Sequence, residues 1–186
     1  MTWNAFHHRG EILQSVVETA DARRDGVLPM ALPGVAETFR DELDVIAALW
    51  LKWNARLSGN IERALTGEPM DLEDAIASAW RLTSEQLPGV RVILDRYAES
   101  PTSPEMAAAL DRASEKEWCR LAAAAGLAND ESPAAARVGR QVELRARTAT
   151  ADGPGPLPDT STNATSTDLD EGSPSLVDRI KAVLAA

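Results

Sequence analysis

Cysteine is nearly absent from this sequence, which has only Cys119. A single thiol cannot form a disulfide within the chain, and this usage is typical of a reducing compartment such as the cytoplasm. The first residues show no apolar run of the kind that a secretory signal has. The densest apolar stretch, residues 45–51, is too short to span a bilayer. We therefore expect a cytoplasmic protein without a membrane partner.

Positive charge is also scarce. The formal net charge is −10, and lysine occurs only at Lys52, Lys116 and Lys181. Nucleic-acid binding depends on neutralising phosphates, and an anionic membrane repels an acidic chain, so neither is an expected partner. Arginine and alanine are abundant instead, which indicates GC-rich coding and a bacterial source.

Aromatic residues make up only 4% of the chain, yet five of them are tryptophans. The tryptophans are Trp3, Trp50, Trp53, Trp80 and Trp118. All five lie before residue 120, so we expect the core in the same part of the chain.

Apolar residues recur at spacings of three and four, and no segment alternates as a strand does. Turns rich in glycine and proline separate the apolar segments. The predicted helices cover residues 3–24, 35–66, 72–86, 90–98, 104–125 and 133–147. Short connections favour antiparallel neighbours. The expected fold is all-α: an antiparallel bundle of four main helices plus short ones, over residues 1–147.

Local signals mark several helix ends. Asp71 and Ser103 are suited to N-cap positions, and Gly67 and Gly126 to the residue after a last turn. The tetrapeptide LPGV occurs at 32–35 and again at 87–90. The sequences after the two copies do not match, so we interpret both as turns and not as a duplicated domain.

The composition changes after residue 147. Residues 148–173 are rich in Ser, Thr, Asp, Gly and Pro, and such a segment buries too little apolar area to offset the entropy of ordering. We predict a disordered acidic linker. Its typical reach is about 25–30 Å, whereas a connection of about two to eight residues is enough to pack one more helix.

Residues 174–186 return to a helical pattern. Five aliphatic residues fall within about 120° of a helical wheel, and they are Leu176, Val177, Ile180, Val183 and Leu184. So short a helix is marginal alone in water and needs a groove. The long linker favours docking on a partner protein over docking on the chain's own bundle, which stays open as the alternative.

Two polar residues fall within predicted apolar stripes. Asn54 lies between Trp50 and Leu57, and Glu117 lies between Ala113 and Leu121. Because a buried carboxylate is costly unless it is paired, Glu117 is expected to form an ion pair or hydrogen bond, or to line a pocket. Asn54 and Glu117 are the candidate pocket residues.

Residues with catalytic or metal-binding chemistry are few. His7 and Glu11 share one helical side, but the motif of a di-iron bundle is missing. Cys119 has no histidine nearby in sequence and is expected to pack. We expect no cofactor and no resident metal.

One basic run interrupts the acidic sequence, at Arg137, Arg140, Arg145 and Arg147. It lacks the aromatic residues that accompany single-stranded nucleic-acid sites. A solvated helix face is the simplest interpretation, and pairing with acidic residues of the tail is the alternative.

These observations favour a non-enzymatic adaptor, regulator or cargo protein that contacts a protein partner through residues 174–186. The alternative is a bundle with a small-molecule or metal site, possibly catalytic, around Glu117 and Asn54 or around His7 and Glu11. The sequence leaves the oligomeric state open.

Overall fold

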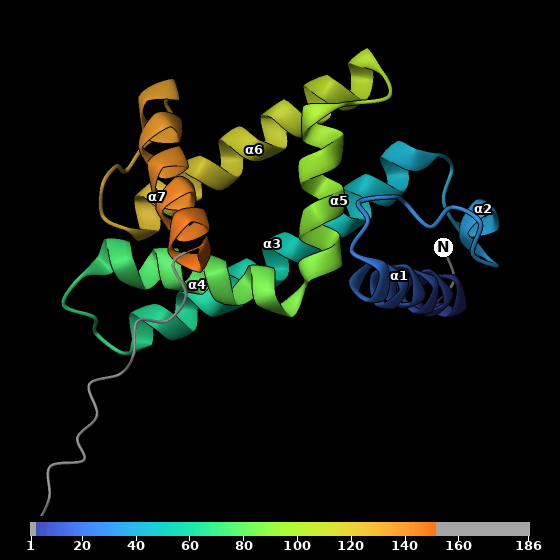
Figure 1. The fold of residues 1–186 in the computed structure, drawn as a ribbon, viewed down its shortest axis with the longest axis horizontal. Coiled ribbons are helices and arrows are strands. Elements are labelled where there is room, and N and C mark those ends of the chain that lie inside the picture. Colours follow the sequence, from blue (N-terminus) through green and yellow to red (C-terminus); the bar gives the residue numbers. More distant parts are fainter. Residues whose placement is uncertain (1–2, 152–186) are drawn as a thin grey trace, which may run out of the picture. The chain divides into compact units, whose positions relative to one another are not determined.

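The computed structural model describes residues 3–151 of the 186, with side chains from residue 7 to residue 149 (Figure 1). This part of the chain is all-α and contains no strand, so the predicted fold class is confirmed. Its helices are α1 (Trp3–Arg23), α2 (Val35–Thr38), α3 (Glu42–Thr66), α4 (Leu72–Gln86), α5 (Pro88–Glu99), α6 (Pro104–Ala124) and α7 (Pro133–Ala151). The predicted linker from residue 152 onward and the predicted helix over 174–186 lie outside the described residues.

Helices α1, α4, α5 and α6 pack on α3, the longest of those described. Helices α3 and α4 run antiparallel, α5 packs on α1, and α7 lies across α6 and against α4 (Figure 1). Leu49, Trp53 and Leu57 of α3 are fully buried at the centre. None of these seven helices is both long and apolar enough to cross a membrane.

The helix predicted over 35–66 is two helices, and this prediction was wrong. The backbone of Phe39 is extended, and Asp41 caps α3 by accepting a 2.8 Å hydrogen bond from the Asp44 N–H. Arg9 of α1 holds the break, because its guanidinium lies 4.2 Å from the centre of the Phe39 ring and donates to the Thr38 carbonyl. Apolar spacing continues through Phe39, which is why periodicity alone hid the interruption.

The second LPGV copy does not form the expected turn. Leu87 alone is non-helical between α4 and α5, and Pro88 is already in the first turn of α5, a position that proline favours. Gly89 lets α5 approach α1, because a Cβ there would lie 2.0 Å from the carbonyl carbon of Ala20. The predicted helix over 90–98 therefore begins two residues earlier, at a sharp corner.

The predicted caps are largely confirmed. Asp71 accepts from the Asp74 N–H and Ser103 from the Met106 N–H. Gly126 has a positive φ of 71°, and the N–H groups after α6 return to the carbonyls of its last turn. Gly67 differs, since its φ is −75°. Helix α7 continues to Ala151, four residues past its predicted end at 147.

Candidate functional site

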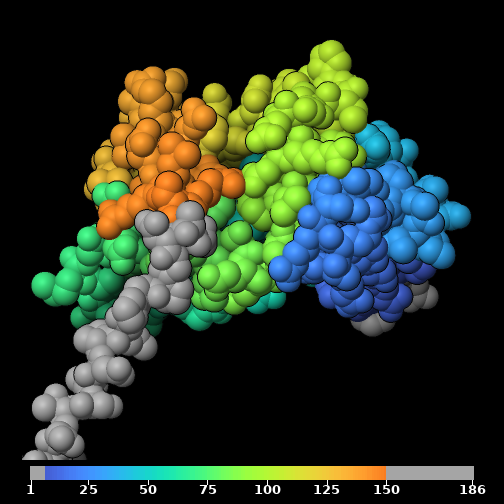
Figure 2. Space-filling view, viewed as in Figure 1, coloured from blue at the N-terminus to red at the C-terminus, as the bar shows by residue number. Residues whose placement is uncertain are grey.

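A cavity of about 570 Å³ lies among helices α3, α5, α6 and α7. Figure 2 shows the hollow between α7, in orange, and α5, in yellow-green. Trp50 and Trp118 contribute aromatic surface to its lining, and charged side chains supply most of the remainder. The residues that line the cavity are far apart in the sequence, from Trp50 to Arg147. The cavity therefore exists only in the folded bundle.

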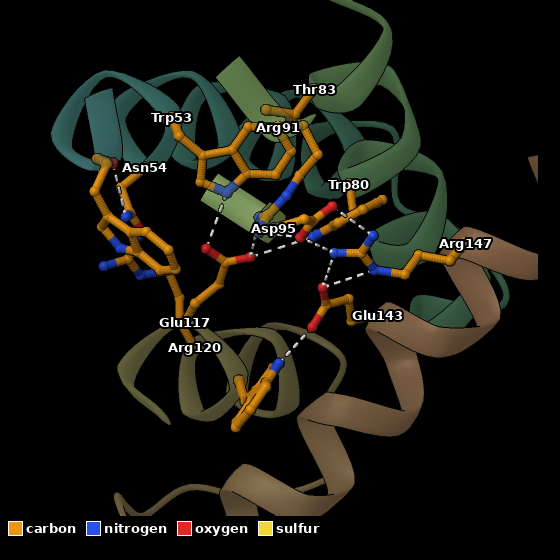
Figure 3. Close-up of polar contacts among 12 residues, drawn as sticks. Trp53, Asn54, Trp80, Thr83, Arg91, Asp95, Glu117, Arg120, Glu143 and Arg147 are labelled. Atoms are coloured by element: carbon orange, nitrogen blue, oxygen red, sulfur yellow. Dashed lines mark hydrogen bonds and ion pairs between the residues drawn. The ribbon is translucent and has the colours of Figure 1, made fainter. Parts of the chain in front are cut away.

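Glu117 of α6 lies at the inner end of the cavity and is only 2% exposed. Its two carboxylate oxygens accept one indole N–H each, from Trp53 at 2.9 Å and from Trp80 at 3.2 Å (Figure 3). The two indole rings are edge to face, with centroids 5.5 Å apart. Helices α3 and α4 thus supply the donors that fix this carboxylate.

Arg91 of α5 is the cation nearest to Glu117. Its side chain is 8% exposed, and its Nη1 lies 3.9 Å from the Glu117 carboxylate. Its Nη2 donates to Asp95 at 2.6 Å, and the guanidinium lies 4.8 Å from the centre of the Trp53 ring. Its Nε is buried and has no hydrogen-bond partner among the described residues.

Arg147 of α7 binds two further carboxylates, those of Asp95 and Glu143. These three residues form a charged cluster with Arg91 and Glu117. Arg147 donates to both oxygens of Asp95, at 2.9 and 2.7 Å, and also to Glu143 (Figure 3). Glu143 in turn accepts the indole N–H of Trp118 at 2.5 Å. Bidentate pairs of this kind are among the strongest charge-assisted hydrogen bonds. Helices α5, α6 and α7 are therefore tied together beside the cavity.

Asp95 and Glu117 have opposite pKa shifts. Burial acts to raise the pKa of Asp95, but hydrogen bonds and charge from Arg147 and Arg91 outweigh it and hold that pKa below its ordinary value. Burial raises the pKa of Glu117, and the Glu143 charge adds to this, while Arg91 and the two indoles oppose it. Glu117 is thus the carboxyl group of the pair that binds a proton more readily.

No protein-family model, curated protein or solved structure matches this chain. The function is therefore argued from the geometry of the site.

The structure does not bring the two predicted pocket residues into one cavity. Asn54 is half-buried, donates to the Trp50 carbonyl and accepts from Arg120 at 2.8 Å. It lines a separate hollow of about 440 Å³ between α3 and α6. Only Glu117 of the two lines the larger cavity.

Sequence patterning singles out neither Arg91 nor Asp95 nor Glu143 as a site residue, and it indicates Arg147 only as part of a basic run. Arg91 and Asp95 lie four residues apart on α5, and so do Glu143 and Arg147 on α7. This spacing is the usual one for an ion pair on a helix, and it was the available signal. Nothing in the local pattern tells that both pairs face the same buried carboxylate.

Most arginines of the basic run on α7 contact other residues of the bundle. Arg145 pairs with Glu73 at 3.1 Å and with Asp74 at 3.4 Å, while Arg147 belongs to the buried cluster. Arg140 lies 5.5 Å from the centre of the Trp118 ring. The suggested pairing with acidic residues of the tail falls outside the described residues.

The other candidate residues lie apart from the cavity. His7 and Glu11 are exposed on α1, and the described residues hold no group of three or more His, Cys, Asp or Glu placed for a metal ion. Cys119 is buried against Ala135 and Ala136 of α7. Burial, together with nearby acidic residues, raises the pKa of the Cys119 thiol, which disfavours the reactive thiolate.

Proposed function

We propose that the bundle is a ligand-binding domain that holds a small organic molecule in the cavity beside Glu117. The observation that carries this proposal is the cavity itself. Its volume of about 570 Å³ lies within the range of about 300–1,000 Å³ that is usual for ligand sites. Its lining combines aromatic surface from Trp50 and Trp118 with more charged side chains than such sites usually have.

The energetics of the charged cluster support a role beyond stability. Glu117 and Arg91 are both buried almost completely, and removing such charges from water carries a large penalty. Well-packed apolar residues in their place are often neutral or stabilising by about 1–4 kcal/mol. Because the arginines and carboxylates largely saturate one another, the cluster is better suited to orienting a bound molecule than to attacking one.

A fragment screen read by NMR tests this proposal. The indole N–H signals of Trp53, Trp80 and Trp118 report on the cluster directly, since each donates to one of its carboxylates. We expect fragments that shift these signals in the wild-type protein and lose at least about tenfold in affinity when Ala98→Phe fills the cavity wall.

Ala108→Phe is the matched control. Ala108 is exposed on α6 and does not line the cavity, so this variant should bind fragments as the wild type does. A screen in which no fragment shifts the indole signals contradicts the proposal. So does binding that survives Ala98→Phe unchanged.

A second candidate function concerns residues 174–186. We propose that this segment docks on a partner protein in the cytoplasm, so that the chain acts as an adaptor, regulator or cargo. The specific observation is the helical spacing of Leu176, Val177, Ile180, Val183 and Leu184. Burial of five aliphatic side chains contributes several kcal/mol, at about 1.5–3 kcal/mol each before ordering costs.

Point substitutions in this segment test the docking. Ile180→Asp places a charge in the aliphatic stripe, whereas Ala182→Asp places the same charge on the other side of the wheel. In quantitative pull-downs from cell extract, Ile180→Asp and removal of residues 172–186 should each lower recovery of the partner about tenfold or more. The melting temperature of the bundle should not change. Equal recovery by the wild type, Ile180→Asp and the truncated protein contradicts the docking.

A further inference from the structure

Negative charge predominates in the lining of the cavity. The acidic residues that line it are Asp95, Glu99, Asp111, Glu115, Glu117 and Glu143, and the basic ones are Arg91, Arg140 and Arg147. Buried Arg91 is already paired with Asp95, and half-buried Arg147 with Asp95 and Glu143. An incoming anion would therefore meet excess negative charge, and among the described lining arginines only exposed Arg140 forms no ion pair.

Three of the acidic residues lie at the exposed edge of the cavity. Asp111 and Glu115 are one turn apart on α6, and Glu99 is on α5. None of the three forms an ion pair among the described residues, because the ion pairs of α5 and α6 involve other side chains. Arg140 is the basic residue at this edge, and it lies over the Trp118 ring.

Glu117 supplies a second and independent sign of a ligand. Its carboxylate lines the cavity, is almost fully buried, and accepts two hydrogen bonds from the described residues, one on each oxygen. Arg91 Nη1, at 3.9 Å, is too far away to donate a third. An ionised carboxylate offers about four acceptor positions. The Glu117 oxygens at the inner end of the cavity can therefore accept further hydrogen bonds from a donor group of a ligand.

The aromatic surface favours an organic cation over a bare metal ion. Trp50 and Trp118 both line the cavity, and tryptophan faces attract organic cations by cation–π interaction. A guanidinium already lies over each ring, that of Arg91 at 5.9 Å from the Trp50 centroid and that of Arg140 at 5.5 Å from the Trp118 centroid, so a ligand cation would join or replace such a contact. The buried Nε of Arg91 has no hydrogen-bond partner among the described residues and would accommodate an acceptor atom on the body of the ligand. The charge of this guanidinium is already met by carboxylates at both terminal nitrogens.

We infer that the ligand of this cavity is an organic cation, namely an amine, amidine or guanidine carried on an aromatic or aliphatic body. This inference rests on the proposed ligand-binding function and names its ligand class. The charged head lies toward the carboxylates and the apolar body lies against the tryptophans.

Three probes of equal size and different charge test the ligand class. They are benzamidine, which is a cation at pH 7, benzamide, which is neutral, and benzoate, which is an anion. Each is titrated into the full chain while the indole N–H signals are followed by NMR. Benzamidine should cause saturable shifts and bind at least about tenfold more tightly than the other two. Its affinity should fall as salt is raised.

Paired variants separate the cavity charge from the overall charge. Asp111→Asn with Glu115→Gln removes two exposed cavity carboxylates and should weaken benzamidine about threefold to tenfold. Glu62→Gln with Glu85→Gln removes two exposed carboxylates that do not line the cavity and should leave its affinity unchanged.

The outcomes distinguish the two proposals. If benzoate or benzamide binds as tightly as benzamidine, the ligand class is wrong and the binding function stands. If the paired control weakens benzamidine as much as the cavity pair does, the cation is held only by the net charge and the inference is wrong. If no probe shifts the indole signals, the ligand class is wrong, and an empty fragment screen then overturns the binding function as well.

Discussion

Alanine at Gly139 should destabilise the bundle by about 3 kcal/mol or more. A Cβ at this position of α7 would lie 1.7 Å from the Trp118 carbonyl oxygen and 2.5 Å from its carbonyl carbon on α6. Both obstacles are backbone atoms inside a helix, so no side-chain rotation relieves the overlap. The two helices must separate, and Trp118 lines the cavity, so ligand affinity should fall too. Urea unfolding followed by circular dichroism measures the loss.

Gly59 of α3 provides the matched control for this substitution. A Cβ at Gly59 meets nothing within 4 Å, and the residue lies inside a helix, where alanine is favoured over glycine by about 0.5–1 kcal/mol. Gly59→Ala should therefore stabilise the protein while Gly139→Ala destabilises it. Equal stability of Gly139→Ala and the wild type would contradict the close crossing of α6 and α7.

The helices were predictable where the signal is local. Asp71 and Ser103 occupy the N-cap positions expected of them, because capping involves residues only three apart. The break before α3 was predictable in the same way only in part. Its N-cap Asp41 also accepts from a residue three positions on, but Arg9, which donates to the Thr38 carbonyl at the break, lies 29 residues earlier in the chain. A helical wheel contains no information about such a contact.

The candidate site was predictable only in part, for the same physical reason. Glu117 was identifiable as a charge among apolar residues, but the indoles that bind it are 64 and 37 residues away in sequence. Asn54 has the same kind of pattern and lies instead at the edge of the buried face of α3, beside Arg120. Spacing tells which residues share a helix face, and only packing tells which part of that face is covered.

Substitution of Arg91 should also lower the free energy of unfolding by a large amount. Replacing it by methionine keeps an apolar side chain of similar length and removes the cation next to Glu117. Removing one partner of a buried ion pair typically costs about 3–5 kcal/mol, because the other charge stays buried without compensation. Asp95 retains Arg147 as its partner, so the effect should arise chiefly from Glu117. The free energy of unfolding in urea at pH 8 measures it.

The stability lost in Arg91→Met should depend on pH, and the direction of this dependence follows from the pKa of Glu117. The pKa of Glu117 is raised in the folded protein above its ordinary value of 4.5, so between these two values the native state binds a proton that the unfolded state has released. Stability from this group therefore falls as pH rises through that window. Without Arg91 the pKa rises further, because the attraction that opposed burial is gone. Arg91→Met should accordingly lose more stability at pH 8 than at pH 5.

Glu117→Gln decides whether this explanation of the Arg91 effect is correct. Glutamine cannot ionise, so in the Arg91→Met background it should restore part of the lost stability at pH 8 and none at pH 5. The rescue is partial because the amide nitrogen of glutamine cannot accept the second indole N–H. The other charged groups of the cluster, Asp95, Glu143 and Arg147, are the same in every variant of this cycle. The coupling energy between positions 91 and 117 therefore isolates their interaction. A double variant no more stable at pH 8 than Arg91→Met would mean that Arg91 acts through its packing on Trp53, and the charge argument would fail.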